Sequence, residues 1–352
     1  MSEASNLPSS TSASMMHVSR RTRRVLPWAV AVLQRPETIT LVLLLAAFGL
    51  GAMLSPYFLN VAGLLDSTSL YMETGVMALA MTLVIISGNI DLSVASILAL
   101  SAVLSAELYA RFNLPMAVAA GLAPLIGAVL GLINGLLVTK VRLPSLVATL
   151  GTMSLYRGLA QVMVGDRSIG HFPEWFVGID FRTVGPVPLP LILFLVLAIL
   201  VGVVLRNTVL GRCVYAVGTN EAAARFNGMR VDRVKLGVFV FSGFMAGVAA
   251  VMMLSRLSVA RFDLANGDEL AVITVVVLGG TDIFGGRGKI LGTVIALFLL
   301  GVIRQGMGLA DISAQKQQVV TGTLLVAAVL LTRTLDWASL RLDQTLKGHE
   351  NA

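Results

Sequence analysis

The chain has 352 residues, of which 56% are hydrophobic and only 13% are charged, and its formal net charge is +7. Soluble domains carry about 25% charged residues, so this composition excludes an ordinary soluble domain and predicts an all-α protein that crosses a lipid bilayer several times. The single cysteine, Cys213, excludes an internal disulfide, and the three histidines predict no metal site.

The first 37 residues are polar and rich in serine and threonine, with a basic run from Arg20 to Arg24. A cleavable secretory signal is a poor interpretation, because the polar lead is too long and no small-residue cleavage site follows the first apolar run. Residues 1–37 are therefore predicted to form a basic cytoplasmic segment ahead of a transmembrane domain.

Ten apolar runs approach the roughly 20 residues that a helix needs to cross a bilayer. They are 38–54, 70–87, 93–110, 115–138, 145–164, 188–205, 235–254, 269–284, 288–303 and 317–332. The predicted transmembrane domain is 38–332, with about ten spans. The runs 269–284 and 288–303 are short and nearly continuous, so they are either full spans or broken, re-entrant half-helices that meet inside the membrane.

The basic residues predict the orientation of these spans. Most of the 26 lysines and arginines fall on the side that contains the N-terminal segment, the loop 206–235 and the tail 333–352. Cytoplasmic loops carry such an excess, so both termini are predicted to be cytoplasmic. The positive charge thus reflects membrane topology, and no nucleic-acid partner is expected. On the opposite side, the aromatic residues in 165–187 are predicted either to form an interfacial belt or to dock a periplasmic partner.

Several polar residues lie in or beside the predicted spans, where a central charge costs about 2.5–3.5 kcal/mol on insertion scales. The candidates for a transport pathway are Glu73, Asn89, Asp91, Ser93, Asn134, Arg157 and Asp282. Gly88–Asp91 interrupts two apolar runs without a proper loop. Two compatible interpretations remain open: Asp91 caps the helix 93–110, or the break faces a cavity in which Asn89 binds a solute.

Arg157 lies about 18 Å into its predicted helix from the inner face. It is expected to snorkel outward or to pair with Glu73, which we place near the outer end of 70–87. Asn134 is expected to hydrogen-bond a neighbouring helix or to line the pathway.

Glycine patterns give two further expectations. Gly279–Asp282 has the same Gly-x-x-Asp form as Gly88–Asp91, which suggests an internal repeat. Gly127, Gly131 and Gly135 form a ridge of small residues suited to close helix contact, and an interface between two copies is one place for it.

No enzymatic motif is present. The nearest phosphate-binding candidate, Gly285–Ile290, lacks the first glycine of that motif and the Ser or Thr that would bind magnesium. The patterns HExxH, GxSxG and paired cysteines are also missing from the sequence. The chain is therefore predicted to be a non-catalytic protein with no cofactor of its own. If it moves solute uphill, an ion gradient or a separate ATPase with ATP and Mg²⁺ supplies the energy.

The inner loop 206–235 is the most informative segment. Gly218-Thr219-Asn220 is expected to break the chain, and Asn220 then caps a short helix, 221–226, with Glu221 in its first turn. Gly228 ends this helix in the left-handed conformation. Such a helix either docks a soluble partner or lies at the lipid interface.

Three segments in order resemble the ribose/rhamnose-type ABC importer permeases. The first is Ser87-Gly88-Asn89-Ile90-Asp91-Leu92-Ser93-Val94. The second, similar to the family's cytoplasmic coupling loop, supplies Gly211, Arg212, Tyr215, Ala216, Val217, Gly218, Asn220, Ala223, Ala224 and Gly228. The third is Leu278-Gly279-Gly280-Thr281-Asp282-Ile283-Phe284-Gly285-Gly286, followed by Gly288.

The sequence departs from the family pattern at Asn89 and Ala95, where glycine is common, and at Phe226-Asn227, where smaller residues are common. The first departure bears on substrate choice or helix packing, and the second bears on the fit to a partner ATPase.

The resemblance implies a permease subunit in a bacterial inner membrane that imports a pentose, hexose or deoxysugar such as ribose or rhamnose. It implies three protein partners: a cytoplasmic ABC ATPase, a second permease copy or paralogue, and a periplasmic solute-binding protein. A quorum-signal furanosyl compound or a branched-chain amino acid remains an alternative substrate. An ion-coupled secondary transporter is the other alternative, although the acidic candidates Glu73, Asp91, Glu107 and Asp282 are few and peripheral.

Overall fold

The computed structural model describes residues 36–54, 57–313 and 315–330. Its longer helices are α2 (Pro36–Leu54), α4 (Met72–Ile86), α5 (Val94–Phe112), α6 (Met116–Thr139), α7 (Ser145–Val164), α9 (Leu189–Asn207), α10 (Val209–Thr219), α12 (Val231–Leu257), α13 (Asp268–Leu278) and α14 (Ile290–Leu309). Short elements are α3 (Val61–Thr68), α8 (Glu174–Val177), α11 (Glu221–Phe226) and the hairpin β1 (Thr183–Val184)–β2 (Val187–Pro188). A last helical segment covers 315–330.

The described structure is therefore helical, as predicted, and each of the ten apolar runs contains a helix. Five helices, α5, α6, α9, α12 and α14, are long and apolar enough to cross a membrane, and the bent pair α3–α4 makes a sixth. The total number of spans, about ten, thus stays a prediction. Most of 1–37 and the tail 333–352 lie outside the described residues.

The run 269–284 is helical over only part of its length. Helix α13 stops at Leu278 because Gly280, at φ +85°, leaves the helical conformation. Its 11 residues span about 16 Å, well short of the roughly 30 Å hydrocarbon core. This length favours the half-helix interpretation of the run.

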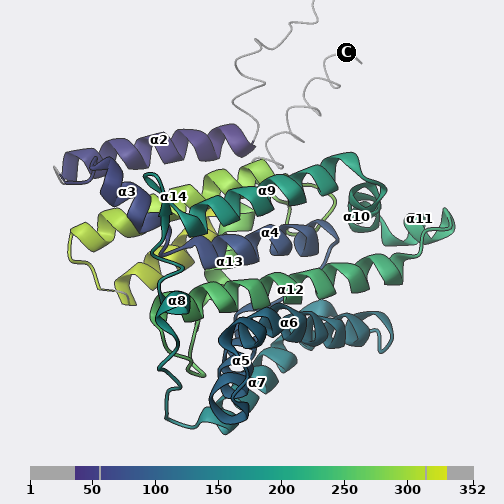
Figure 1. Cartoon of the computed structure of the whole chain (residues 1–352). Coiled ribbons are helices and arrows are strands. Elements are labelled where there is room, and N and C mark those ends of the chain that lie inside the picture. The colour runs from purple at the N-terminus through teal and green to yellow at the C-terminus, as the bar shows by residue number, and fades with distance from the viewer. Residues whose placement is uncertain (1–35, 55–56, 314, 331–352) are drawn as a thin grey trace, which may run out of the picture.

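Helix α4 is the centre of the fold. Each of its 15 residues is buried, and it packs against α9, α12, α13 and α14. A helix that is apolar on every side can only be stable when protein or lipid surrounds it completely. In Figure 1, α4 lies in the interior, with α12 between it and the group α5–α7.

The predicted glycine ridge lies within the chain. A Cβ on Gly127 would collide with the carbonyl oxygen of Gly243 in α12, and one on Gly131 with that of Phe239 in α12. A Cβ on Gly247 would collide with Ala123 in α6. The two helices approach so closely that only hydrogen fits between their backbones. An interface between two copies is therefore the wrong place for this ridge.

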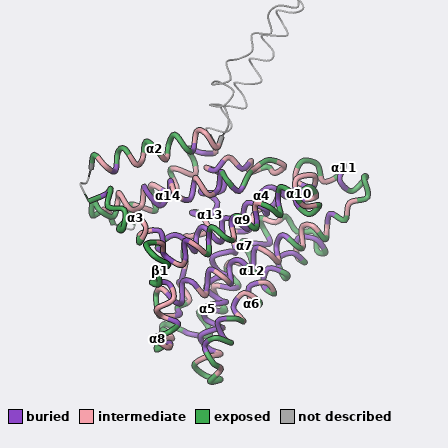
Figure 2. The backbone as a smooth tube through the Cα atoms, turned by 45° about the horizontal axis from the view of Figure 1, so that its top comes forward, coloured by how far each residue is buried: buried purple, intermediate pink, exposed green. Residues whose placement is uncertain are grey.

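The connections gather at two ends of the bundle. Figure 1 shows α10 and α11 at one end and α3 and α8 at the other. Figure 2 shows burial concentrated in the interior, whereas α11 projects with much of its surface exposed. Segments predicted to be cytoplasmic share the α11 end, where Gly88, Arg142 and Lys235 line one cleft.

Candidate functional site

The three sequence motifs meet at the α11 end of α4. The backbone N–H of Gly286 donates to the carbonyl of Ile86 at 2.8 Å, and the Tyr215 hydroxyl donates to the carbonyl of Gly288 at 2.6 Å. We call the five glycines at this meeting point the glycine junction; they are Gly88, Gly218, Gly285, Gly286 and Gly288. The sequence contains all five, but their spacing gives no sign that they are neighbours.

Glycine is required here for two reasons. A Cβ on Gly218 would overlap the carbonyl oxygen of Ile86, and one on Gly285 would lie 2.8 Å from the Cα of Gly88. In addition, Gly88, Gly285 and Gly286 have φ values of +77°, +92° and +77°, which are costly for residues with a side chain. The junction therefore joins the ends of α4 and α10 and the α13–α14 loop through backbone contact.

The two helix breaks begin in the same way, as the predicted repeat requires. Gly88 N–H bonds to Ile85 and Asn89 N–H to Val84; likewise Gly280 N–H bonds to Val277 and Thr281 N–H to Val276. These are the paired bonds of a glycine-terminated helix. The equivalent glycines are thus Gly88 and Gly280, so the predicted alignment of Gly88 with Gly279 is wrong by one residue.

Asp91 is the centre of a buried polar network that connects four helices. Its Oδ1 accepts from the Ser93 N–H at 3.0 Å and from the Ser93 hydroxyl at 2.6 Å, and its Oδ2 accepts from Ser242 on α12 at 2.9 Å. Asn134 on α6 donates to Ser93 at 2.7 Å. The Tyr156 hydroxyl on α7 lies 3.2 Å from Asn134 Oδ1.

This network decides the role of Asp91. Asp91 satisfies the backbone just before α5, as a cap does, and it is fully buried. Asn89 lines an open cleft together with Gly88 and Ser145, but it is only 4% exposed, and its amide donates to the carbonyl and the hydroxyl of Ser87. Asp91 therefore acts as a cap, and binding of a solute by Asn89 stays a prediction.

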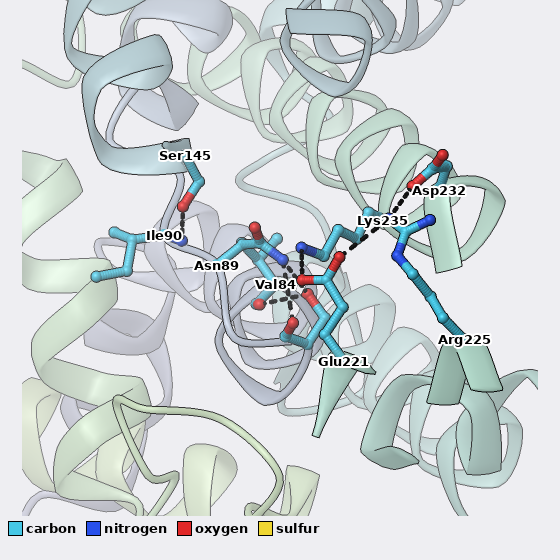
Figure 3. Close-up of polar contacts among 9 residues, drawn as sticks. Val84, Asn89, Ile90, Ser145, Glu221, Arg225, Asp232 and Lys235 are labelled. Atoms are coloured by element: carbon cyan, nitrogen blue, oxygen red, sulfur yellow. Dashed lines mark hydrogen bonds and ion pairs between the residues drawn. The ribbon is translucent and has the colours of Figure 1, made fainter. Parts of the chain in front are cut away.

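The cleft has a volume of about 720 Å³ and lies between the first break, the α6–α7 loop and the segment α11–α12. Figure 3 shows Asn89, Glu221 and Lys235 close together at its wall. Arg142, Arg225 and Asp232 also line it. Its polar rim and small amide and hydroxyl groups suit a hydrated, neutral solute better than an apolar one.

Helix α11 forms as the sequence predicts, with the expected ends. Asn220 Oδ1 accepts from the Ala223 N–H at 2.9 Å, and Gly228 follows with φ +77°. The break before α11 is shorter than expected, because Gly218 and Thr219 belong to α10, a helix that the sequence analysis missed. The apolar positions Val214 and Val217 of α10 were the available signal.

Ion pairs fix α11 to α12. Glu221 accepts from Lys235 at 2.7 Å and from Arg225 at 3.0 Å, and Arg225 also bonds to Asp232. The hydrogen bond from Lys235, followed by that from Arg225, holds the pKa of Glu221 below its ordinary value. Ala224 is buried beside Val217 and Val231, so the inner face of α11 is anchored as well.

The outer face of α11 is open. Ala223 is exposed, and Phe226 is 93% exposed, an unusual state for a phenyl ring in a polar segment. Arg212 is exposed on α10, whereas Gly211 is buried under the carbonyl of Leu205. The exposed face of α11 therefore has the features of a docking surface, and its role stays a prediction.

Glu73, Arg157 and Asp180 lie at the opposite end. The predicted pair of Arg157 with Glu73 is wrong: Glu73 is bound by Arg256 of α12 at 2.7 Å, because the last turn of α12 lies beside the start of α4. Arg157 instead donates to the carbonyls of Phe262 and Leu264 at 2.7 Å and 2.6 Å. The side chain of Asp282, the remaining candidate, accepts from the Phe284 N–H at 3.0 Å, within its own loop.

Asp180 was not singled out by the sequence. It lies in the connection between α8 and β1, where its Oδ2 has no hydrogen-bond partner among the described residues. Burial, and then the neighbouring Glu73 carboxylate, raise the pKa of Asp180 to about 7, although Arg256 opposes this shift.

A family model described as the permease component of the branched-chain amino acid transport system matches residues 63–329, which include all three motifs. The chain belongs to this permease family. The permease is thus a transport subunit and a multi-pass membrane protein, as its motifs and apolar helices indicated.

Curated relatives of this permease are import permeases of similar length. The ribose import permease protein RbsC of Escherichia coli (strain K12) is 36% identical over 303 residues, 84% of this chain and 93% of the relative. The autoinducer 2 import system permease protein LsrD of Enterobacter sp. (strain 638) is 35% identical over 300 residues, 84% of this chain and 91% of the relative. No solved structure gives a significant match.

Proposed function

We propose that this permease forms the translocation pathway of an ATP-driven importer in a bacterial inner membrane. Its substrate is a monosaccharide or a related furanosyl compound, because the relatives named above import ribose and autoinducer 2. The observation that carries the mechanism is the glycine junction, which links the coupling segment α10–α11 directly to both helix breaks.

The proposed topology has about ten spans and both termini in the cytoplasm. It is supported by the grouping of segments: the basic inner segments meet at the α11 end, whereas residues of 165–187 contact those of 255–268 at the other end, as in the bridge between Ile169 and Ala260. Cysteine labelling in a Cys213→Ala background tests it. Thr219→Cys should be shielded from external reagents in spheroplasts, and Glu174→Cys should react.

The motion of α11 has two routes into the membrane. The first runs through α10 to Gly218 and the backbone of Ile86 and Gly286. The second runs from Glu221 to Lys235 and along α12 to Ser242, which bonds to Asp91. A partner ATPase that binds Ala223 and Phe226 would thus act on both breaks, displace the second against the first, and open or close the polar cleft beside Asn89.

The other components follow from this assignment. ATP and Mg²⁺ bind to the partner ATPase, and the permease carries no cofactor. A second permease copy or paralogue completes the pathway. A periplasmic binding protein delivers substrate at the α8 end, where Trp175 and Phe181 are 46% and 67% exposed.

Site-directed crosslinking tests the ATP-driven mechanism. Ala223→Cys, again without Cys213, should crosslink to a co-purifying ATPase, and Trp175→Cys at the opposite end is the matched control. In proteoliposomes, uptake of labelled ribose should require ATP inside and the binding protein outside. Uptake that follows a proton or sodium gradient without a bound ATPase would instead identify a secondary transporter.

A further inference from the structure

An apolar groove of about 360 Å³ lies between α9, α10 and α12, with Leu83 of α4 among its lining residues. Its walls include Leu200 and Val204 of α9, Leu210 of α10 and Phe244 of α12, all of them exposed in the described chain. The one charged residue in its lining is Arg233.

The length and position of the groove match one leaflet of a bilayer. Along α12 its lining extends from Arg233 to Met245, which is about 18 Å at 1.5 Å per residue. Half of a hydrocarbon core of about 30 Å is close to this length. In the proposed orientation Arg233 lies at the cytoplasmic interface and Met245 lies near the midplane.

No carboxylate in the part of the chain that the structure describes pairs with the charge at the end of the groove. Arg225 and Lys235 form ion pairs with Glu221 and Asp232, whereas Arg233 forms none with a carboxylate of the described residues. An arginine at a membrane interface binds phosphate through several donors, and basic pockets between helices on the cytoplasmic side recognise anionic lipid headgroups.

We propose that this groove binds one anionic phospholipid of the cytoplasmic leaflet, with an acyl chain between α9 and α12 and its phosphate at Arg233. The apolar walls favour an acyl chain, and the single cation at one end of the groove favours an anionic headgroup there. The lipid would lie between Leu210 of α10 and Phe244 of α12, and so would support the position of the coupling segment.

Gly237 provides a sharp test. It lines the groove, and a Cβ at this position would meet nothing within 4 Å, so Gly237→Leu starts a side chain in open space and should occupy part of the groove. Gly151 on α7 is the matched control, because it is also exposed and its Cβ would also meet open space. The full-length permease is placed in nanodiscs of phosphatidylethanolamine and phosphatidylglycerol, with a trace of phosphatidylglycerol that carries a diazirine in its acyl chain.

In the wild type we expect photo-adducts on peptides from α9, α10 and α12. These adducts should be lost in the Gly237→Leu variant and kept in the Gly151→Leu variant. Arg233→Gln should reduce the preference for phosphatidylglycerol over a phosphatidylethanolamine probe by about fivefold, the loss of one interfacial cation. Equal labelling by both probes in the wild type, or adducts that survive Gly237→Leu, would overturn the proposal. So would a photo-reactive residue at Val204 that captures a second copy of the chain.

The proposal uses the orientation given under Proposed function, and its failure can be distinguished from a failure of that function. Labelling of Thr219→Cys from outside would show that the permease has the opposite orientation. The photo-adducts on α9, α10 and α12 would still form. If no photo-adducts form, the lipid proposal fails. The assay of ATP-dependent uptake still tests the proposed function separately.

Discussion

The two helix breaks share the same glycine stop but are held in different ways. The first break, after α4, is tied by side chains of three neighbouring helices: Ser145 of α7, Asn134 of α6 and Ser242 of α12. The second break, after α13, is held by backbone groups: Asp282 N–H bonds to Arg287, and Gly285 N–H bonds to Asp282. Its bonds to other segments also use its backbone, at Gly286 and Gly288.

The difference indicates a division of roles. A network of buried, satisfied side chains fixes one arrangement, because each broken bond leaves a polar group unpaired. A loop held by backbone bonds and by close glycine contacts has few such side-chain bonds to break. Its Thr281 Oγ1 has no partner among the described residues. We therefore expect the first break to stay fixed in the transport cycle and the second to move against it.

The largest expected effect is at the glycine junction, where the two breaks touch. Gly218→Ala places a methyl group on the carbonyl of Ile86, and neither backbone can yield cheaply. Overpacking of this kind typically costs about 1–3 kcal/mol, and here it also separates the breaks. ATP-dependent uptake in proteoliposomes should fall at least about tenfold, since 1.4 kcal/mol is a factor of ten.

Gly228→Ala and Gly151→Ala are the matched controls. Gly228 has a left-handed φ of +77° but open space around it, so alanine there should cost only about 1 kcal/mol of local strain. Gly151→Ala should behave as the wild type. If Gly218→Ala transports as well as Gly228→Ala, the junction is not the link between the breaks.

The second largest effect should separate the two aspartates. Asp91→Ala leaves the Ser93 and Ser242 hydroxyls without their acceptor, a loss of about 1–3 kcal/mol for each buried group. Asp282→Ala removes one bond in a half-buried turn and should cost less than about 1 kcal/mol. Thermal unfolding in detergent measures both.

Asp91→Asn sharpens this comparison, because the amide oxygen still accepts a hydrogen bond. It should recover part of the lost stability. A melting temperature for Asp282→Ala as low as that of Asp91→Ala would contradict the division between a fixed and a mobile break.

The sequence predicted the separate parts of this site better than their arrangement. Helix α11, its Asn220 cap and its glycine stop could be predicted because they depend on residues only a few positions apart. The meeting of Ile86, Gly218 and Gly286 could not, because it depends on how α4, α10 and α13 pack, and a glycine looks the same whether it forms a turn or a close contact. The partner of Glu73 was missed for the same reason: two arginines were available, and only the packing of α12 beside α4 selects Arg256.

A smaller effect is expected from the second route to the first break. Glu221→Gln weakens the ion pair with Lys235 and so loosens α11 from α12, while the route through Gly218 stays intact. The pair is 42% exposed on the glutamate side, so its contribution is under about 1 kcal/mol. We expect a two- to threefold drop in substrate-stimulated ATP hydrolysis, in line with that energy.

The pH dependence of this route has a defined sign. The pKa of Glu221 is lowered by its bonds to Lys235 and Arg225, so the ion pair is fully formed above the ordinary value of 4.5 and is lost only in more acid solution. Between pH 6 and 8, wild type and Glu221→Gln should therefore differ by a constant factor. A ratio that changes across this range would mean that another group controls the coupling.

The smallest effect concerns the Met72 end of α4, the helix that leads into the first break. Asp180 is 3% exposed and lies near the Glu73–Arg256 pair that anchors this end, and burial raises its pKa from 3.8 to about 7. Below about pH 4 the folded and unfolded states both hold the proton. As pH rises toward 7, the unfolded chain ionises while the native carboxyl stays neutral, so the native state loses stability, and the loss levels off once the native group ionises.

Asp180→Asn keeps the neutral form at every pH, so its melting temperature should fall less than that of the wild type between pH 5 and 8. Trp175→Ala, in the same outer segment and without an ionisable group, controls for a general loosening of this end and should keep the wild-type slope. Parallel curves for wild type and Asp180→Asn would show that Asp180 is already ionised in the native state. The Met72 end of α4 would then be held by an ionic cluster, and the contrast between a fixed first break and a mobile second one would depend on the Asp91 network alone.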